Sequence, residues 1–141
     1  MKLNVKLLRS QKGMTLLEIM IVLAILGGMI AVLAVQVNSR LKAAKIKQAK
    51  IQISELGKAL DMYFTDCNQY PSGDEGLNAL VQAPSSCSNW GPDPYLKKVN
   101  KDPWNGDFQY ESTGNDYTLR SLGSDHKEGG TGDAADISSK E

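Results

Sequence analysis

Four acidic side chains lie in a glycine-rich stretch near the C-terminal end of the sequence: Asp125, Glu128, Asp133 and Asp136. Hard cations such as Ca²⁺ take roughly six to eight oxygen ligands from carboxylates and backbone carbonyls, and glycines allow a chain to curl around an ion. The stretch lacks the EF-hand spacing. By itself it is compatible with a calcium site and with an ordinary acidic surface loop.

The two cysteines, Cys67 and Cys87, enclose a segment that is predicted to hold a short helix. A disulfide between them would stabilise the fold by about 3 kcal/mol in the chain-entropy description. The alternative is a pair of free, buried thiols. We favour the disulfide.

Nothing in the sequence indicates catalysis. His126 is the single histidine and stands in the acidic stretch, so no Ser-His-Asp or Cys-His arrangement is expected, and no glycine-rich phosphate motif follows a predicted strand. The 16 basic and 16 acidic residues balance to a net charge of zero, which argues against a nucleic-acid-binding protein. The sequence therefore predicts a protein that is not an enzyme.

The charges are strongly ordered along the chain of 141 residues. A basic leader of four Lys and Arg residues precedes 24 residues, Met14–Val37, in which Glu18 is the only ionisable side chain. A basic stretch from Arg40 to Lys58 and an acidic remainder follow. Since about 20 apolar residues in a helix cross the hydrocarbon core of a bilayer, the apolar stretch predicts a single membrane-spanning helix.

Glu18 is the unusual residue of this span. A charged carboxylate deep in a membrane costs roughly 2.5–3.5 kcal/mol on insertion scales. Glu18 therefore either lies at the membrane interface, close to the end of the span, or is neutralised by a cation that the span does not contain. The basic stretch near Arg40 is either a solvated or headgroup-facing collar or a contact for acidic parts of other copies.

The helix is predicted to continue beyond the membrane. No proline occurs between Val37 and Pro71, and apolar residues recur at helical spacing. This stripe consists of Ile46, Ala49, Ile53, Leu56, Leu60 and Tyr63. We expect one helix from about Met14 to Phe64, with an amphipathic half at residues 39–65 whose stripe packs against the following domain.

The remaining chain favours a small α+β head. Ser72–Glu75 provide N-cap candidates for a short helix that ends before Pro84. Phe108–Glu111 and Tyr117–Leu122 alternate apolar and polar residues around a turn and predict a hairpin, with a possible third strand at Ala135–Ser138. The expected fold is a long N-terminal α-helix packed against a small antiparallel β-sheet.

The residues KGMTLLEIMIVLAILGGM, Lys12–Met29, resemble the class III signal of type IV pilins and pseudopilins. The resemblance implies that a prepilin peptidase removes residues 1–13 by cutting between Gly13 and Met14 and then methylates the Met14 amine. It also implies that Glu18 pairs with the Met14 amine of a neighbouring subunit. Residues 14–38 would form the transmembrane and assembly half of the helix, and residues 39–141 the periplasmic head.

Three further stretches resemble, more narrowly, the major pseudopilin of the bacterial type II secretion system. They are Ala59–Tyr63 with Gln69–Pro71, Asp74–Val81, and Lys101–Gly106. The resemblance implies a pilin-like fold and a homopolymer that forms a periplasmic pseudopilus and drives the export of folded proteins. Implied partners are minor pseudopilins, an inner-membrane assembly platform and the prepilin peptidase. Implied localisation is the inner membrane, with the C-terminal domain in the periplasm.

The resemblance further implies that the acidic stretch binds Ca²⁺. Asp125 and Asp136 match the expected carboxylate ligands, with backbone carbonyls from near Leu122 and Ser124, while Asp133 is the least secure ligand. Ala134-Ala135 stand where many relatives have a further acid.

Two other interpretations remain at this point. One is a type IV pilin for adhesion, motility or DNA uptake. The other is a secreted, soluble binding domain, because Val32-Leu33-Ala34 also fits an ordinary signal-peptidase site with cleavage after Ala34. The length of the apolar run and Glu18 within it argue against the secreted domain.

Overall fold

The computed structural model describes residues 13–140, so the predicted leader cations Lys2, Lys6, Arg9 and Lys12 lie outside the described residues. The chain divides into two compact units between Ser39 and Arg40. The first unit contains the apolar half of a long helix, and the second contains the rest of that helix with the head.

Helix α1 extends from Leu16 to Cys67 without interruption, which confirms the predicted continuous helix. Thr15 caps its start, because the Thr15 hydroxyl accepts the backbone N–H of Glu18 at 3.2 Å. The helix ends where Asn68 takes the left-handed conformation, with φ at 56°, and donates its N–H to the Phe64 carbonyl at 2.8 Å. Asparagine is one of the few residues that adopt this conformation easily after a helix.

The apolar stripe of the second half of α1 is the centre of the head's core. Ala49, Ile53, Leu56, Leu60 and Tyr63 are all buried, as the spacing predicted. The residues from the rest of the head that complete this buried cluster are Leu77, Ala79, Leu80, Cys87, Phe108, Leu119 and Ile137. The head is therefore built around the helix and has no separate core of its own.

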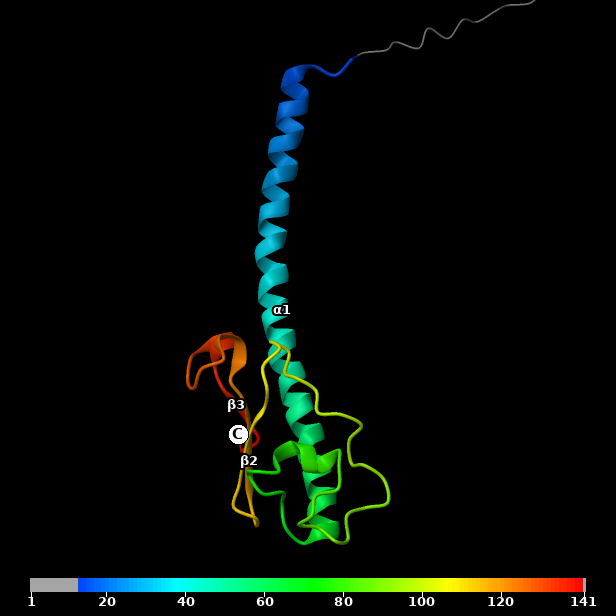
Figure 1. Cartoon of the computed structure of the whole chain (residues 1–141). Coiled ribbons are helices and arrows are strands. Elements are labelled where there is room, and N and C mark those ends of the chain that lie inside the picture. The colour runs from blue at the N-terminus through cyan, green and yellow to red at the C-terminus, as the bar shows by residue number, and fades with distance from the viewer. Residues whose placement is uncertain (1–12, 141) are drawn as a thin grey trace, which may run out of the picture. The chain divides into compact units, whose positions relative to one another are not determined.

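A three-stranded antiparallel sheet lies alongside this part of α1 (Figure 1). It consists of β1 (Gln109–Ser112), β2 (Tyr117–Ser121) and β3 (Ile137–Ser138), in the order β1-β2-β3. Leu119 of β2 is completely buried, and the neighbouring strand adds buried Ile137. The predicted hairpin and third strand are confirmed, with small shifts of their ends.

The predicted short helix is a 3₁₀-helix, η1, from Gly76 to Leu80. Ser72 and Glu75 exchange side-chain to backbone hydrogen bonds at 3.4 Å in the preceding turn, in the manner of a capping box. Gly76 then adopts a φ of +57°, which interrupts the right-handed helical conformation between the turn and the helix. This is why the segment does not form one α-helix. Two further 3₁₀ turns are η2 (Gly123–Asp125) and η3 (Gly132–Ala134).

The predicted disulfide is formed. Cys67 and Cys87 are bonded, with their Cα atoms 5.4 Å apart, and they join the last residue of α1 to the loop that follows η1. The bond closes a loop over a sequence separation of 20 residues around buried residues of the core. The bond therefore lowers the conformational entropy of the unfolded chain, in a segment of the head that has no strands to hold it.

The five tyrosines form two groups of aromatic contacts in and around the core: Tyr63 with Tyr95, and Tyr70 with Tyr117 and Tyr110. Ring centroids are 5.8 Å apart for Tyr63 and Tyr95, 4.8 Å for Tyr70 and Tyr117, and 6.4 Å for Tyr110 and Tyr117. Burial raises the pKa of each of these phenols, and for Tyr70 burial together with its 3.1 Å hydrogen bond to Asp61 raises the pKa to about 12.

We predict that the head loses stability as the pH rises from about 10 to about 12. The raised pKa means that the folded state keeps Tyr70 protonated, whereas the unfolded chain releases the proton near the ordinary value of about 10, so alkaline pH favours unfolding. Phenolate absorbance should titrate later in folded than in urea-unfolded protein. Tyr70→Phe should remove the latest phase; identical curves for both states would contradict the prediction.

Candidate assembly surfaces and ion loop

The first half of α1 is an apolar surface that nothing in its own unit covers. Every residue from Gly13 to Lys45 is exposed, and the stretch is long and apolar enough to cross a membrane. A side chain added at Gly27 or Gly28 would meet nothing within 4 Å, so this chain alone does not require glycine there. The shallow groove over Gly28 is lined by Ala24, Ile25, Met29, Val32 and Leu33.

Glu18 makes no ion pair with any side chain in residues 13–140. It is exposed in the first turn of α1. The next charged residue along the helix is Arg40, about 33 Å further on at 1.5 Å per residue. Within one described chain, this carboxylate therefore has no cation near it.

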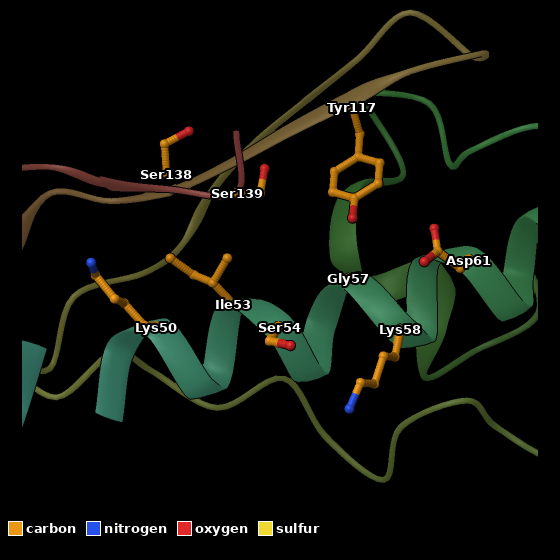
Figure 2. A pocket seen from close by; sticks show the side chains of 9 residues that line it. All are labelled: Lys50, Ile53, Ser54, Gly57, Lys58, Asp61, Tyr117, Ser138 and Ser139. Atoms are coloured by element: carbon orange, nitrogen blue, oxygen red, sulfur yellow. The ribbon is translucent and has the colours of Figure 1, made fainter. Parts of the chain in front are cut away.

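In the second unit, a groove of about 380 Å³ runs between α1 and the sheet (Figure 2). Lys50, Ser54 and Lys58 line it from α1 at intervals of four residues, and Tyr117 and Ser139 line it from the sheet side; the Lys58 side chain points away from Tyr117 (Figure 2). Sequence reasoning did not find this groove, because it depends on how the sheet packs.

Gly57 explains how the sheet approaches the helix so closely at this groove. A Cβ on Gly57 would lie 2.9 Å from the Tyr117 hydroxyl, so a larger residue would push the strand away. The glycine in the middle of a helix, which costs about 1 kcal/mol of helix propensity, is retained for packing.

The basic stretch of α1 is divided between two environments. Lys42 forms an ion pair with Asp133 at 3.3 Å, whereas Lys47, Lys50 and Lys58 are exposed and have no ion pair within residues 13–140. Desolvation raises the pKa of Asp133, but the hydrogen bond and the charge of Lys42, together with hydrogen bonds from its own backbone and from Ser124, outweigh it and hold the pKa below its usual value. Asp133 therefore contacts the helix, a contact that its sequence position did not indicate.

The acidic stretch folds into a loop in which η2 and η3 lie against each other. Gly123 has a φ of +66°, and a Cβ placed on it would lie 2.9 Å from the carbonyl oxygens of both Asp133 and Ala135. Only glycine allows this approach. We call residues 122–136 the ion loop, after the ion that the sequence predicts for it; its second arm approaches Gly123 through the carbonyl oxygens of Asp133 and Ala135.

The predicted carboxylate ligands have different surroundings in the ion loop. Asp125 accepts the backbone N–H of Lys127 at 3.1 Å, and Asp136 accepts that of Gly129 through Oδ2 at 3.1 Å. The other oxygen of Asp136, Oδ1, is buried and has no hydrogen-bond partner. In the described part of the chain, no three Asp, Glu, His or Cys side chains gather as a preformed metal cluster.

The carboxylate and carbonyl oxygens of this loop suit an ion that accepts backbone carbonyls as ligands better than one that needs side-chain ligands alone. A buried carboxylate oxygen without a partner is costly unless a cation or donor satisfies it. The closely approaching carbonyls of Asp133 and Ala135 are the other kind of ligand that Ca²⁺ accepts. The carboxylate of Asp133, in contrast, is already bonded to Lys42.

Two sequence-family models match adjoining parts of the chain. "Prokaryotic N-terminal methylation motif" matches residues 8–35, and "Type II secretion system (T2SS), protein G" matches residues 36–140. The second match covers more than half of the sequence. The chain belongs to the type II secretion system protein G family.

Two relatives match over nearly their whole length. The "Type II secretion system core protein G" of Pseudomonas aeruginosa is 46% identical over 92% of this chain and 94% of its own. That of Vibrio cholerae is 40% identical, over 94% of this chain and 93% of its own. The crystal structure of the major pseudopilin from the type 2 secretion system of enterohaemorrhagic Escherichia coli aligns with a TM-score of 0.61 at 32% identity. It covers 71% of this chain and 90% of that one.

These matches confirm the family and the fold that the motifs suggested. They favour a secretion-system pseudopilin over the alternatives of a type IV pilin and of a secreted domain released after Ala34. The family is a structural component of a secretion system.

Proposed function

We propose that this protein G is the major structural subunit of a periplasmic pseudopilus, which polymerises to drive the export of folded proteins across the outer membrane. One observation carries the proposal. The first half of α1 exposes an unbroken apolar surface with a single carboxylate, and no cation in the same described chain reaches it.

The apolar half of α1 suits two environments in succession. As a single chain it would span the inner membrane, where its side chains contact lipid. In a filament the same side chains would pack against other copies, and the shallow groove over Gly28 would allow helices to approach closely. One surface would therefore serve both as membrane anchor and as polymer interface.

The partner that Glu18 lacks would come from another copy. Cleavage between Gly13 and Met14 would create a new amino group four residues before Glu18 in each subunit. In an apolar setting, the amine of one subunit and the Glu18 carboxylate of its neighbour would neutralise each other. Because an unpaired carboxylate is costly there, the pair would also select the register between copies.

The second unit would lie in the periplasm. A disulfide in a small domain suits an oxidising compartment, and the bond between Cys67 and Cys87 meets this condition. Prepilin peptidase, minor pseudopilins and the inner-membrane assembly platform would be its partners. The force for assembly would come from another component, because the proposed role of this chain is structural and not enzymatic.

The ion loop would hold a structural Ca²⁺. Asp125 and Asp136 would supply carboxylate oxygens, and the backbone near Leu122 and Ser124 would supply carbonyl oxygens. The support for this is the buried, unpartnered Oδ1 of Asp136 and the close approach of the two loop arms at Gly123. Asp133 would hold the loop to α1 through Lys42 and would not contribute its carboxylate to the ion. The bound ion would offset part of the negative charge of this loop, in which Lys127 is the one lysine beside four acidic side chains.

The mature chain is expected to begin at Met14 with a methylated amine, because processing exposes the group that Glu18 needs. Mass spectrometry of protein purified from a strain with an active secretion system would test this. Gly13→Val should leave the chain uncleaved but folded, since a side chain at Gly13 meets nothing within 4 Å. A mature chain beginning at Val35 would overturn the proposal.

Glu18→Ala should insert into the membrane normally but assemble poorly. Loss of the carboxylate leaves the neighbour's amine unpaired in an apolar setting, which at roughly 2.5–3.5 kcal/mol corresponds to a decrease in association on the order of 100-fold. Filament yield after shearing and pelleting measures this. Glu55→Ala, which removes an exposed acid from the second half of α1, is the comparison for general loss of charge. Wild-type yield for Glu18→Ala would refute the pairing.

Removal of Ca²⁺ should lower the melting temperature of the head. An ion present at a hundredfold over its Kd stabilises by about 2.7 kcal/mol, which for a domain of this size is on the order of 10 °C. Asp136→Asn should abolish this response, while Asp93→Asn, at an exposed site outside the loop, should retain it. Equal melting temperatures of the wild type in Ca²⁺ and in chelator would rule out the ion.

A further inference from the structure

Two polar side chains stand out because they are buried in the head: Asp102, 5% exposed, and Ser121, fully buried. Asp102 lies in the turn before β1, and Ser121 is the last residue of β2, directly before the ion loop. They are 19 residues apart in sequence and hydrogen-bonded to each other. Burial of a carboxylate is costly unless each of its oxygens is bonded, so its partners indicate what it holds in place.

Asp102 first organises its own turn. Its Oδ1 accepts the backbone N–H groups of Trp104 at 3.0 Å and Gly106 at 2.6 Å. Its backbone N–H donates to the Gly106 carbonyl at 2.9 Å, which closes the turn. With Oδ1 occupied in this way, the carboxylate has a fixed orientation and its second oxygen points out of the turn toward Ser121.

Ser121 connects this fixed carboxylate to the ion loop. Its hydroxyl donates to Asp102 Oδ2 at 2.6 Å and accepts the backbone N–H of Gly123 at 3.3 Å. Gly123 is the first residue of η2 and the point where the two arms of the ion loop meet. The peptide that carries the Leu122 carbonyl is therefore held through Ser121 by a carboxylate outside the loop.

The same turn also contacts the other end of η2. The ring of His126 lies over Gly106, where a Cβ would come within 2.8 Å of its Nδ1 and 3.1 Å of Asp102 Oδ2. His126 follows Asp125 and is itself in the left-handed conformation, with φ at 55°. Asp125 thus lies between two points, Gly123 and His126, that the Asp102 turn restrains.

We propose that Asp102 and Ser121 are positioning residues for the ion loop: their hydrogen bonds hold residues 122–126 in the shape that binds the ion. This inference rests on the Ca²⁺ site proposed above and goes beyond its ligands. Oxygen ligands bind an ion strongly only when they are held close to the required geometry before it arrives. A loop with few ligating side chains and several glycines depends on such support from outside.

The test compares two serines with matching local roles. Ser112 accepts the N–H of Gly114, two residues on, at 3.0 Å, just as Ser121 accepts that of Gly123, but the structure gives Ser112 no bond to a buried carboxylate. We expect Ser121→Ala to raise the Kd for Ca²⁺ about tenfold, the scale of one hydrogen bond to a charged group, and Ser112→Ala to leave it unchanged. Calorimetric titration of the chelator-stripped full chain in detergent measures both.

A second variant separates positioning from general stability. Asp102→Asn should raise the Kd for Ca²⁺ by a similar factor. The double variant, Asp102→Asn with Ser121→Ala, should have a Kd no higher than that of the weaker-binding single variant, because both residues act through one chain of hydrogen bonds. Luminescence lifetimes of bound Tb³⁺ should show additional water on the ion in both single variants. A merely structural role would lower the Ca²⁺-free melting temperature and leave Kd and lifetime at wild-type values.

Each outcome is decisive. Wild-type Kd values in Ser121→Ala and Asp102→Asn, or an equal loss in Ser112→Ala, would overturn the positioning role while leaving the ion site intact. If Ser121→Ala does not fold, Asp102→Asn decides alone. No saturable Ca²⁺ binding by the wild type would instead show that the ion site itself is wrong, and this inference would fall with it.

Discussion

The head of this protein has too little apolar surface to enclose a core without the second half of α1. Among residues 13–140, six of the thirteen buried apolar residues come from this one helix, and η1, β2 and β3 supply five of the other seven. Small domains bury a smaller fraction of their surface than large ones, so a contribution of this size is decisive. The disulfide at Cys67 and the ring contacts of Tyr63 with Tyr95 and of Phe64 with Tyr70 also join the helix to the loops that cover it.

The first half of α1 is in the opposite situation, because none of its residues belongs to the buried core of the head. Its side chains are more apolar than those of the second half, yet nothing in its own unit covers them, and its one charge has no partner in the described chain. A surface of this kind needs lipid or other copies of itself. A single continuous helix therefore has two different halves. The first half of α1 needs lipid or other copies to cover its apolar side chains, and the second half completes the core of the head. This combination suits a subunit stored in a membrane and used in a polymer.

Buried carboxylates mark the places where the head departs from simple hydrophobic packing. Asp102 is satisfied by three hydrogen bonds and stabilises the turn before β1. Asp136 is only half satisfied, because its Oδ1 has no partner. The first arrangement is complete within the chain, whereas the second leaves one buried oxygen without a partner. Ser121 and Gly123 join the turn of Asp102 to the start of the loop that contains Asp136.

Patterns that depend on neighbours in the sequence could be read directly. The apolar run, the position of Glu18 and the stripe from Ile46 to Tyr63 determined the helix and its two environments, because helical periodicity is a local property. The hairpin followed from alternation, and the pairing of two lone cysteines from their number. The acidic loop was recognisable by composition, although the contacts of its carboxylates were not.

Contacts between distant segments were decided only by the tertiary structure. Nothing near Asp133 in the sequence shows that Lys42, 91 residues away, holds its carboxylate, or that Gly57 is small to admit Tyr117. Asp102 reads locally as an ordinary turn residue, and its bond to Ser121 exists only because the turn packs beneath the end of β2. The physical reason is the same in each case. The burial and the partners of a side chain depend on which segments the core brings together, and the spacing of neighbouring residues in the sequence does not predict this.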